Sequence, residues 1–277
     1  MSKDASLRDA LRVPAGPISP AGFDSGAKPL LPKSGAMAHD LAEMSELQER
    51  LWAESTAGGQ RRVLLVLQGM DTAGKGGVVT HAVGVFGPIG VEYTAFKKPT
   101  EEELAHDFLW RIRKRLPRPG IIGVFDRSHY EDVLVARVHS LAPQEEIEAR
   151  YDTINAFEQE LVDGGTTVLK AFLHVSYDVQ RERLLRRLAK PDKHWKFNAG
   201  DIDERARWDE YQAAYAAVLE RCSTDAAPWY VVPADHKTYR NWAVAELLRE
   251  TLAELDPRYP QPDLDVEALR ARLAPPH

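Results

Sequence analysis

Residues 63–77 read Val-Leu-Leu-Val-Leu-Gln-Gly-Met-Asp-Thr-Ala-Gly-Lys-Gly-Gly, and this segment carries the strongest indication of the fold class. The apolar run at residues 63–67 predicts a buried strand, and a helical pattern follows at residues 75–86. The glycines and the lysine between them have the spacing of a phosphate-binding loop, in which successive backbone N–H groups turn around a phosphate at a helix N-terminus. We expect this loop to bind phosphate through Gly69, Thr72, Ala73, Gly74, Lys75 and Gly76.

Two positions depart from the common form of this loop. Gly76 stands where a magnesium-binding Ser or Thr usually follows the lysine, and Asp71 places a carboxylate inside the loop. That carboxylate would repel a phosphate unless a cation lay between them, so we expect Asp71 to bind Mg²⁺. Lys75 would follow the transferring phosphoryl group. The alternative is a glycine-rich turn without a ligand, which the complete spacing between strand and helix disfavours.

A second acid follows another apolar run. Residues 121–125 predict a strand, and Asp126 and Arg127 come directly after it. Ligands of open α/β sheets bind beyond the carboxyl ends of the strands. We therefore expect Asp126 to share the Mg²⁺ with Asp71, and Arg127 to reach phosphate oxygens with its planar guanidinium. Asp is also a common helix N-cap, and Asp126 can serve both purposes.

Apolar runs alternate with amphipathic stretches along the whole chain. The predicted strands cover residues 63–67, 91–96, 121–125, 167–175 and 229–232. The predicted helices cover residues 38–53, 75–86, 100–116, 129–138, 144–162, 177–188, 201–221 and 239–255. This order predicts an α/β P-loop kinase fold, with a five-stranded parallel sheet, helices on both faces and a helical lid.

Composition narrows the class of protein. The 277 residues are 44% hydrophobic and 28% charged, which is typical of a globular domain. No apolar run approaches the ~18 residues of a membrane span, and the net charge of −6 argues against a general nucleic-acid binder. Cys222 is the only cysteine, so the chain cannot form an internal disulfide, and residues 1–12 contain no apolar signal segment. We expect a cytoplasmic protein with no membrane or nucleic-acid partner.

Positive charge is concentrated at residues 181–196. This segment contains seven Lys or Arg and two acids, so it carries +5 and the rest of the chain −11. Its helical pattern passes into a basic loop and then a second helix, at the place where P-loop monophosphate kinases carry a lid. Phosphoryl transfer needs cations that close over the reacting phosphates, and we expect Arg187, Lys193 and Lys196 to supply them.

Other cations are assigned mainly to the solvated surface. Arg181 and Arg186 are as compatible with an ordinary helix face as with the lid. A second cluster without acids lies before the third predicted strand and consists of Arg111, Arg113, Lys114, Arg115 and Arg118. This cluster could lie where a long anion leaves the site, but Arg113 does not share the helix face of Arg111 and Arg115, so a solvated position is mainly expected.

The chain divides into three predicted parts. Frequent prolines and glycines predict an extended arm at residues 1–36. The kinase core is expected at residues 37–258, with the lid at about residues 178–210. Residues 259–277 are expected to form a tail with a short helix.

Four motifs together resemble the polyphosphate kinase 2 family. They are Gly69-Met-Asp-Thr-Ala-Gly-Lys-Gly-Gly77, Phe125-Asp-Arg-Ser-His-Tyr-Glu-Asp132, Arg183–Arg187 with Pro191-Asp-Lys-His-Trp-Lys196, and Pro233-Ala-Asp-His-Lys-Thr-Tyr-Arg-Asn241. The resemblance extends from about residue 35 to 255. It implies a thymidylate-kinase-like fold, reversible transfer of the terminal phosphoryl group between inorganic polyphosphate and AMP or ADP, formation of ADP or ATP, Mg²⁺ as cofactor and assembly as homodimers or tetramers.

The resemblance also implies roles for individual residues. The catalytic centre would consist of Asp71, Lys75, Asp126 and Arg127, and the lid that binds polyphosphate would carry Arg183, Arg187, Lys193 and Lys196. Lys237 and Arg240 are further motif positions whose role stays open. His129-Tyr130-Glu131 is similar to the group that accepts both AMP and ADP, whereas the ADP-preferring group has Trp-Tyr-Asn there. We therefore expect Glu131 to lie beside the acceptor nucleotide.

Two other functions are compatible with a phosphate loop. An ATP-dependent nucleoside or nucleotide kinase would use ATP as donor and would not use polyphosphate. A non-enzymatic binding module would keep the loop and lack the acid after the third strand. The basic segment and Gly76 favour polyphosphate over ATP, and Asp126 disfavours the binding module.

Overall fold

A computed structural model describes residues 6–31 and 36–274 of the chain. Its five strands form one parallel sheet in the order β2-β3-β1-β4-β5. The strands are β1 (Arg62–Gln68), β2 (Val91–Ala95), β3 (Ile122–Asp126), β4 (Thr166–His174) and β5 (Trp229–Pro233). The predicted α/β fold is confirmed, and every strand agrees with its predicted range to within one residue at each end.

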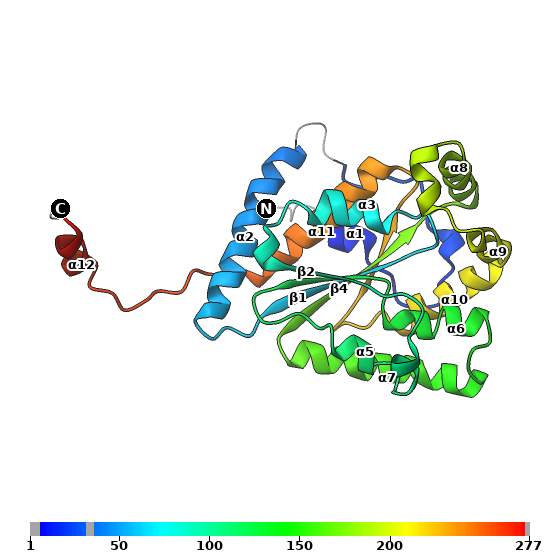
Figure 1. Ribbon diagram of the computed structural model, residues 1–277, viewed down its shortest axis with the longest axis horizontal. Helices are drawn as coiled ribbons and strands as arrows, with labels where there is room; N and C mark the ends of the chain where they lie inside the picture. Colours follow the sequence, from blue (N-terminus) through cyan, green and yellow to red (C-terminus); the bar gives the residue numbers. More distant parts are fainter. Residues whose placement is uncertain (1–5, 32–35, 275–277) are drawn as a thin grey trace.

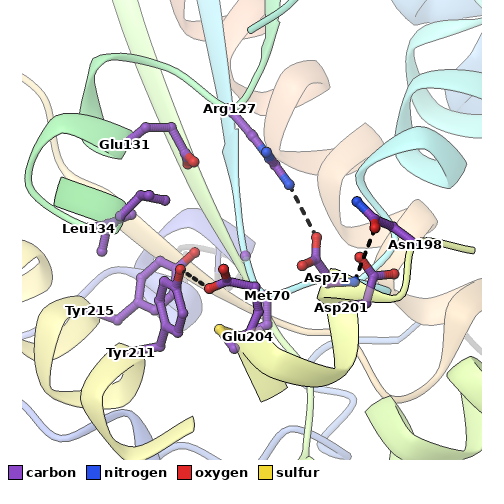
Figure 2. Close-up of a pocket in the computed structure, with 13 residues that line it drawn as sticks. Met70, Asp71, Arg127, Glu131, Leu134, Asn198, Asp201, Glu204, Tyr211 and Tyr215 are labelled. Carbon is purple, nitrogen blue, oxygen red and sulfur yellow. Dashed lines mark hydrogen bonds and ion pairs between the residues drawn. The ribbon is translucent and has the colours of Figure 1, made fainter. Parts of the chain in front are cut away.

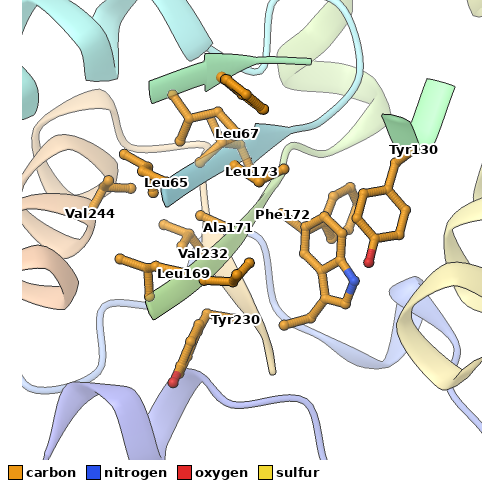
Figure 3. Close-up of a cluster of buried hydrophobic side chains, with 14 of the residues drawn as sticks. Leu65, Leu67, Tyr130, Leu169, Ala171, Phe172, Leu173, Tyr230, Val232 and Val244 are labelled. Carbon is orange, nitrogen blue, oxygen red and sulfur yellow. The ribbon is translucent and has the colours of Figure 1, made fainter. Parts of the chain in front are cut away.

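Helices cover both faces of the sheet, as Figure 1 shows. One face carries α2 (Ala36–Thr56), α3 (Lys75–Val78) and α11 (Lys237–Leu255), and the other carries α5 (Trp110–Arg113) and α7 (Gln144–Asp163). The side chains of β1 from Val63 to Leu67 have no exposed surface. Figure 3 shows Leu65 and Leu67 in one cluster with apolar side chains of β4 and β5. A parallel sheet covered on both faces has no solvent side, which is why its strands are continuous apolar runs.

Six further helical elements follow β3 or β4 along the chain and lie near the carboxyl ends of the strands. They are the short helix η4 (His129–Asp132), α6 (Val135–Val138), α8 (Tyr177–Leu188), η5 (Pro191–Lys196), α9 (Gly200–Ala206) and α10 (Trp208–Arg221). β1 lies between β3 and β4, and Leu67 is in register with Asp126. The loop after β1 and the acid after β3 are therefore neighbours at this edge of the sheet.

The helix predicted at residues 100–116 is wrong in extent. The structure has only α4 (Glu101–Leu104), with a capping box at Thr100, and then α5, which begins at Trp110. Between them Asp107 accepts a hydrogen bond from the Leu109 amide (3.0 Å), and the His106 ring stacks on Trp110. The side chain of Asp107 thus competes with continuous helical hydrogen bonding at this point.

The helix predicted after the phosphate loop changes its form. α3 passes directly into a π-helical turn, η2 (Val79–Val83), which ends at Gly84. π-Helical turns are rare and occur frequently at functional sites. Here the turn follows the helix whose N-terminus forms part of the loop.

The N-terminal arm is not extended throughout, so this part of the prediction is corrected. Residues Leu7–Leu11 form α1, whose Leu7 and Leu11 are buried against α11 and β5. Glu250 of α11 accepts hydrogen bonds from the amides of Leu7 (2.8 Å) and Arg8 (2.9 Å). Apolar burial and these capping bonds outweigh the tendency of nearby prolines to keep the chain extended. Residues 1–5 and 32–35 of the arm lie outside the described residues.

The C-terminal tail contains α12 (Val266–Leu273), which stands away from the core in Figure 1. Its apolar side chains Val266, Leu269 and Leu273 are exposed. Among the described helices, none combines the length and the apolar composition that crossing a membrane requires.

Candidate active site

The loop after β1 has the backbone of a phosphate cradle. Gly69 and Gly74 have φ of +152° and +111°, and Thr72 between them has φ of +63°. A Cβ at Gly69 would lie 2.7 Å from the backbone oxygen of Leu173, so only glycine fits there. These left-handed residues turn the chain tightly before α3 begins at Lys75.

Among the described residues, two polar side chains of this loop bond to no side chain or backbone group outside it. Lys75 Nζ donates to the Gly69 carbonyl (2.7 Å), and the buried Thr72 hydroxyl oxygen has no hydrogen-bond partner among the described residues. Buried polar groups normally have a partner. A phosphate in the loop would supply acceptors to both side chains and to the backbone N–H groups.

Asp71, Asp126 and Arg127 meet beside the loop, as the sequence predicts for neighbouring strand ends. Arg127 Nη2 lies 3.2 Å from Asp71 Oδ1, and Asp126 Oδ2 accepts a weak hydrogen bond from the Tyr93 hydroxyl (3.4 Å). Burial acts to lower the pKa of Arg127, but the carboxylates of Glu131, Asp71 and Asp126 outweigh it and raise that pKa. Arg127 therefore stays cationic within an acidic cluster.

The donor set fits a magnesium ion that is shared with phosphates. Asp71 and Asp126 line one cavity together with Lys75 and Arg127. Within the described part of the chain, no three His, Cys, Asp or Glu side chains surround a metal position. Mg²⁺ at phosphoryl-transfer sites needs only one or two carboxylates, because water and substrate phosphates complete its coordination.

Glu131 faces Arg127 across the cavity shown in Figure 2. It belongs to the single turn η4 rather than to the longer helix expected at residues 129–138. Burial raises the pKa of Glu131, while Arg127 and Lys75 act to lower it. The carboxyl group therefore lies within electrostatic reach of Arg127 and Lys75.

A buried polar cluster holds the turn that carries Glu131. The Tyr130 hydroxyl donates to Glu158 (2.8 Å) and accepts from Lys170 (2.8 Å), and Lys170 also forms an ion pair with Glu158. His129 lies 3.2 Å from the same Glu158 carboxylate. All four side chains are fully or almost fully buried. No periodic pattern in the sequence predicts this cluster, because its members come from η4, α7 and β4.

A cavity of about 250 Å³ lies between the loop, η4 and the helices α9 and α10. Figure 2 shows the side chains that line it. Met70, Asp71 and Arg127 line one side. The other side is formed by residues that sequence reasoning missed: Asn198, Asp201, Glu204, Tyr211 and Tyr215. The Tyr211 hydroxyl donates a hydrogen bond to the Glu204 carboxylate. The Tyr215 ring stacks on the Phe172 ring, with 4.4 Å between the ring centroids. Asn198 and Asp201 come soon after the motif that ends at Lys196, whereas Tyr211 and Tyr215 lie further along the chain, and the fold brings them to one cavity.

A larger cavity of about 690 Å³ adjoins the first and shares Arg127, Glu131 and Glu204 with it. Its wall is mixed, with apolar side chains and cations: Phe96, Lys97, Lys98, Leu104, Arg111, Val135, Leu141 and Arg150. Arg111, which was expected at the solvated surface, is buried and donates to the Lys97 carbonyl (2.9 Å). The two cavities together form a cleft on the Glu131 side of the loop, called here the acceptor cleft.

A basic groove lies on the opposite side of the loop, beneath α8 and η5. Its lining includes Thr72, Gly74 and the cations Arg183, Arg186, Arg187, Lys190, Lys193, Lys196, Lys237 and Arg240. Among the lining residues there is no acid. Arg187 also pairs with Asp201 of α9 at 3.3 Å, which links the groove to the acceptor side. The groove brings the predicted Arg187, Lys193 and Lys196 together with Lys237.

Arg183 differs from the expected lid position. It is buried, and its guanidinium donates to four backbone carbonyls, of Thr72, Ala73, Ala234 and Asp235, at 2.6–3.2 Å. Arg240 likewise donates to the Ala73 carbonyl (2.9 Å), and a Cβ at Gly74 would collide with its guanidinium. Both arginines brace the phosphate loop from behind, because their planar donor sets match the carbonyls of its tight turn.

A parallel sheet whose central strand enters a phosphate loop, with an acid at the end of the next strand and basic helices above, defines a P-loop kinase. Comparison with known proteins narrows the class. The polyphosphate kinase 2 family matches residues 34–260, and this chain belongs to that family.

Individual relatives agree along most of the chain. The AMP/ADP-polyphosphate phosphotransferase of Meiothermus ruber is 47% identical over 91% of this chain and 92% of its own length. The ADP-polyphosphate phosphotransferase of Rhodopseudomonas palustris is 42% identical over 80% of this chain and 79% of its own. The crystal structure of polyphosphate kinase 2 from Arthrobacter aurescens is 48% identical, with a TM-score of 0.94 over 99% of this chain and 98% of that one.

Proposed function

We propose that this protein transfers the terminal phosphoryl group between inorganic polyphosphate and AMP or ADP, with Mg²⁺ as cofactor. The observation that carries the proposal is the basic groove, whose lining contains eight Lys or Arg and no acid and which reaches the phosphate loop. A polyanionic donor with no base or sugar needs only such a row of cations. Membership of the polyphosphate kinase 2 family and the names of its relatives support the same assignment.

The two substrates occupy opposite sides of the loop in this proposal. Polyphosphate lies in the basic groove, and the nucleotide lies in the acceptor cleft, where apolar side chains such as Phe96 and Leu104 offer a surface for the nucleoside. A third cavity joins the two sides and is lined by Lys75, Arg127, Arg187 and Lys196 among others. The reacting phosphates would meet there.

Transfer then requires mainly positioning and charge. An oxygen of the acceptor phosphate attacks the terminal phosphorus of polyphosphate, the P–O bond to the next phosphate breaks, and the shortened polyphosphate leaves with the electron pair. The attacking phosphate oxygen is already ionised near neutral pH, so no general base is needed. Lys75 and Arg127 stabilise the charge on the transferring group, and Arg187 and Lys196 act on the leaving chain. Mg²⁺ held by Asp71 and Asp126 would neutralise phosphate charge.

We also propose that both AMP and ADP are accepted and that the protein assembles as a homo-oligomer. The His-Tyr-Glu turn and the name of the Meiothermus ruber relative support the first point. The exposed apolar face of α12, at Val266, Leu269 and Leu273, supports the second, since a partner chain would cover it. The buried free thiol of Cys222 accords with a reducing cytoplasm.

The direct test incubates the purified protein with AMP and long-chain polyphosphate in the presence and absence of Mg²⁺, and follows ADP and ATP by chromatography. A parallel reaction offers ATP as donor to AMP and to adenosine. We expect product from polyphosphate only with Mg²⁺. Product from ATP with adenosine and none from polyphosphate would instead identify an ATP-dependent nucleoside kinase.

A further inference from the structure

A second groove continues from the basic groove and passes beneath the N-terminal arm. Its lining includes Lys28 of the arm, Arg183 and Arg186 of α8, and Lys237 and Thr238 at the start of α11. Arg183, Arg186 and Lys237 line both grooves, so the two form one path that leads away from the phosphate loop. The catalytic residues and the acceptor cleft lie at the other end of this path.

Positive charge prevails along this second groove. Lys28, Arg186 and Lys237 form no ion pair with an acid of the described part of the chain. Burial and the charges of Arg186, Arg183, Arg240 and Lys190 all lower the pKa of Lys237, which marks a concentration of cations. An anion bound here would relieve that repulsion.

The two acids of the groove do not cancel its charge. Asp235 is engaged in the fold, because its carboxylate accepts from the Ser25 hydroxyl (2.8 Å) and from the Ser176 amide (2.8 Å). Glu182 is exposed on the α8 side of the groove. The four Lys and Arg side chains of the lining outnumber these two carboxylates.

The groove also contains the N-terminus of a long helix. α11 begins at Lys237, which lines the groove. Its N-cap residue His236 makes no side-chain capping bond among the described residues. A helix N-terminus carries partial positive charge and free N–H donors. Together with Lys28, Arg186 and Lys237, it points to an anionic ligand.

The arm is held firmly enough to present Lys28 at a fixed place. The Asp235 amide donates to the Ser25 carbonyl (3.1 Å), and the Tyr239 hydroxyl donates to the Pro29 carbonyl (3.0 Å). The His174 ring lies 3.1 Å from the Phe23 carbonyl oxygen. These contacts fix residues 23–29 of the arm against the ends of β4 and β5.

We infer that this groove is a binding site for the distal phosphates of a long polyphosphate chain, with Lys28, Arg186 and Lys237 as its cations. The inference rests on the proposed function. It makes the protein favour long chains over short ones, since a three-phosphate chain engaged at the loop meets fewer of these cations than a long chain.

The test compares Lys28→Glu with Lys114→Glu, using kcat/KM for long-chain polyphosphate and for tripolyphosphate at fixed AMP and Mg²⁺. Lys114 is an exposed lysine of the α5 segment that lines neither groove. We expect the ratio of long-chain to tripolyphosphate kcat/KM to fall roughly threefold to tenfold in Lys28→Glu, the scale of one exposed charge pair lost and reversed. Lys28→Arg should restore the ratio, and Lys114→Glu should keep the wild-type ratio.

The outcomes separate this inference from the proposed function. Equal ratios in Lys28→Glu, Lys114→Glu and wild type would overturn the distal site, even with vigorous polyphosphate-dependent ADP formation. A wild-type protein that forms no ADP from either polyphosphate would overturn the proposed function itself. A smaller dependence of the long-chain KM on salt in Lys28→Glu than in wild type would further support the distal site.

Discussion

Two carboxylates, Asp71 and Asp126, face one cavity from neighbouring strand ends, and Arg127 contacts the first of them. If both bind Mg²⁺, Asp71→Asn and Asp126→Asn should each lower kcat at least ~10²-fold, because charge stabilisation at the transferring phosphoryl group is lost. Thermal unfolding should be little changed, since both side chains are at a cleft. Asp152→Asn, at an exposed position of α7, is the control. Near-normal turnover in either site variant would remove that residue from the metal site.

Glu131 places a carboxylate beside Arg127, at the junction of the two parts of the acceptor cleft. AMP brings fewer phosphate charges than ADP, so a carboxylate here penalises AMP less. We predict that Glu131→Asn lowers kcat/KM for AMP more than for ADP, and that Glu131→Gln, which keeps the size, separates charge from length. The alternative outcome is that the ratio of kcat/KM for AMP to kcat/KM for ADP is the same in wild type and both variants. In that case Glu131 serves only as an acid in the first turn of η4, which contributes up to ~1 kcal/mol of stability.

At the scale of elements, α8 and η5 form the roof of the basic groove. Removing charge at Arg187, Lys193 or Lys196 should raise KM for polyphosphate roughly threefold to tenfold, with a smaller effect on the nucleotide and a weaker dependence on salt. Arg181→Ala is the matched control, because Arg181 is exposed on the same helix and does not line the groove. Equal changes for both substrates would mean that the lid closes the site without selecting polyphosphate.

The buried cluster joins β4, α7 and η4 through Lys170, Glu158 and Tyr130. Lys170→Met leaves the Glu158 carboxylate buried without its cation, so the free energy of unfolding should fall by about 3–5 kcal/mol. The double variant Lys170→Met, Glu158→Gln should be less destabilised than Lys170→Met, because the unpaired charge is gone. Urea unfolding measures the free energy of unfolding of the wild type, of Lys170→Met and of the double variant. A loss below ~1 kcal/mol for Lys170→Met would show that the ion pair contributes little.

At the scale of the whole molecule, elements with a strong apolar pattern were predictable and contacts between distant segments were not. The strands are continuous apolar runs because both faces of the sheet are buried, and this pattern is visible in the sequence. The helix predicted at residues 100–116 failed because one side chain, Asp107, bonds to the local backbone. Periodicity carries no signal for such a bond.

In the site, too, local patterns were predictable and contacts between distant segments were not. The sequence placed Asp71, Lys75, Asp126 and Arg127 at one edge of the sheet, because the carboxyl ends of parallel strands meet there. Tyr211 and Tyr215 join the acceptor cleft only through the packing of α10. Likewise, a basic motif does not reveal that Arg183 is engaged by backbone carbonyls. Charge and spacing identify candidate cations, and only the fold separates those that brace the loop from those that remain available to a ligand.

Polyphosphate and nucleotide are proposed to bind on opposite sides of one phosphate loop and to react directly. Initial rates of ADP formation with Mg²⁺, measured across a matrix of AMP and polyphosphate concentrations, test this arrangement. Two sites occupied at once predict double-reciprocal lines that intersect, since both substrates must be bound before transfer. Parallel lines, the kinetic sign of a covalent phosphoenzyme formed by one substrate at a time, or the absence of ADP at every concentration, would contradict the account.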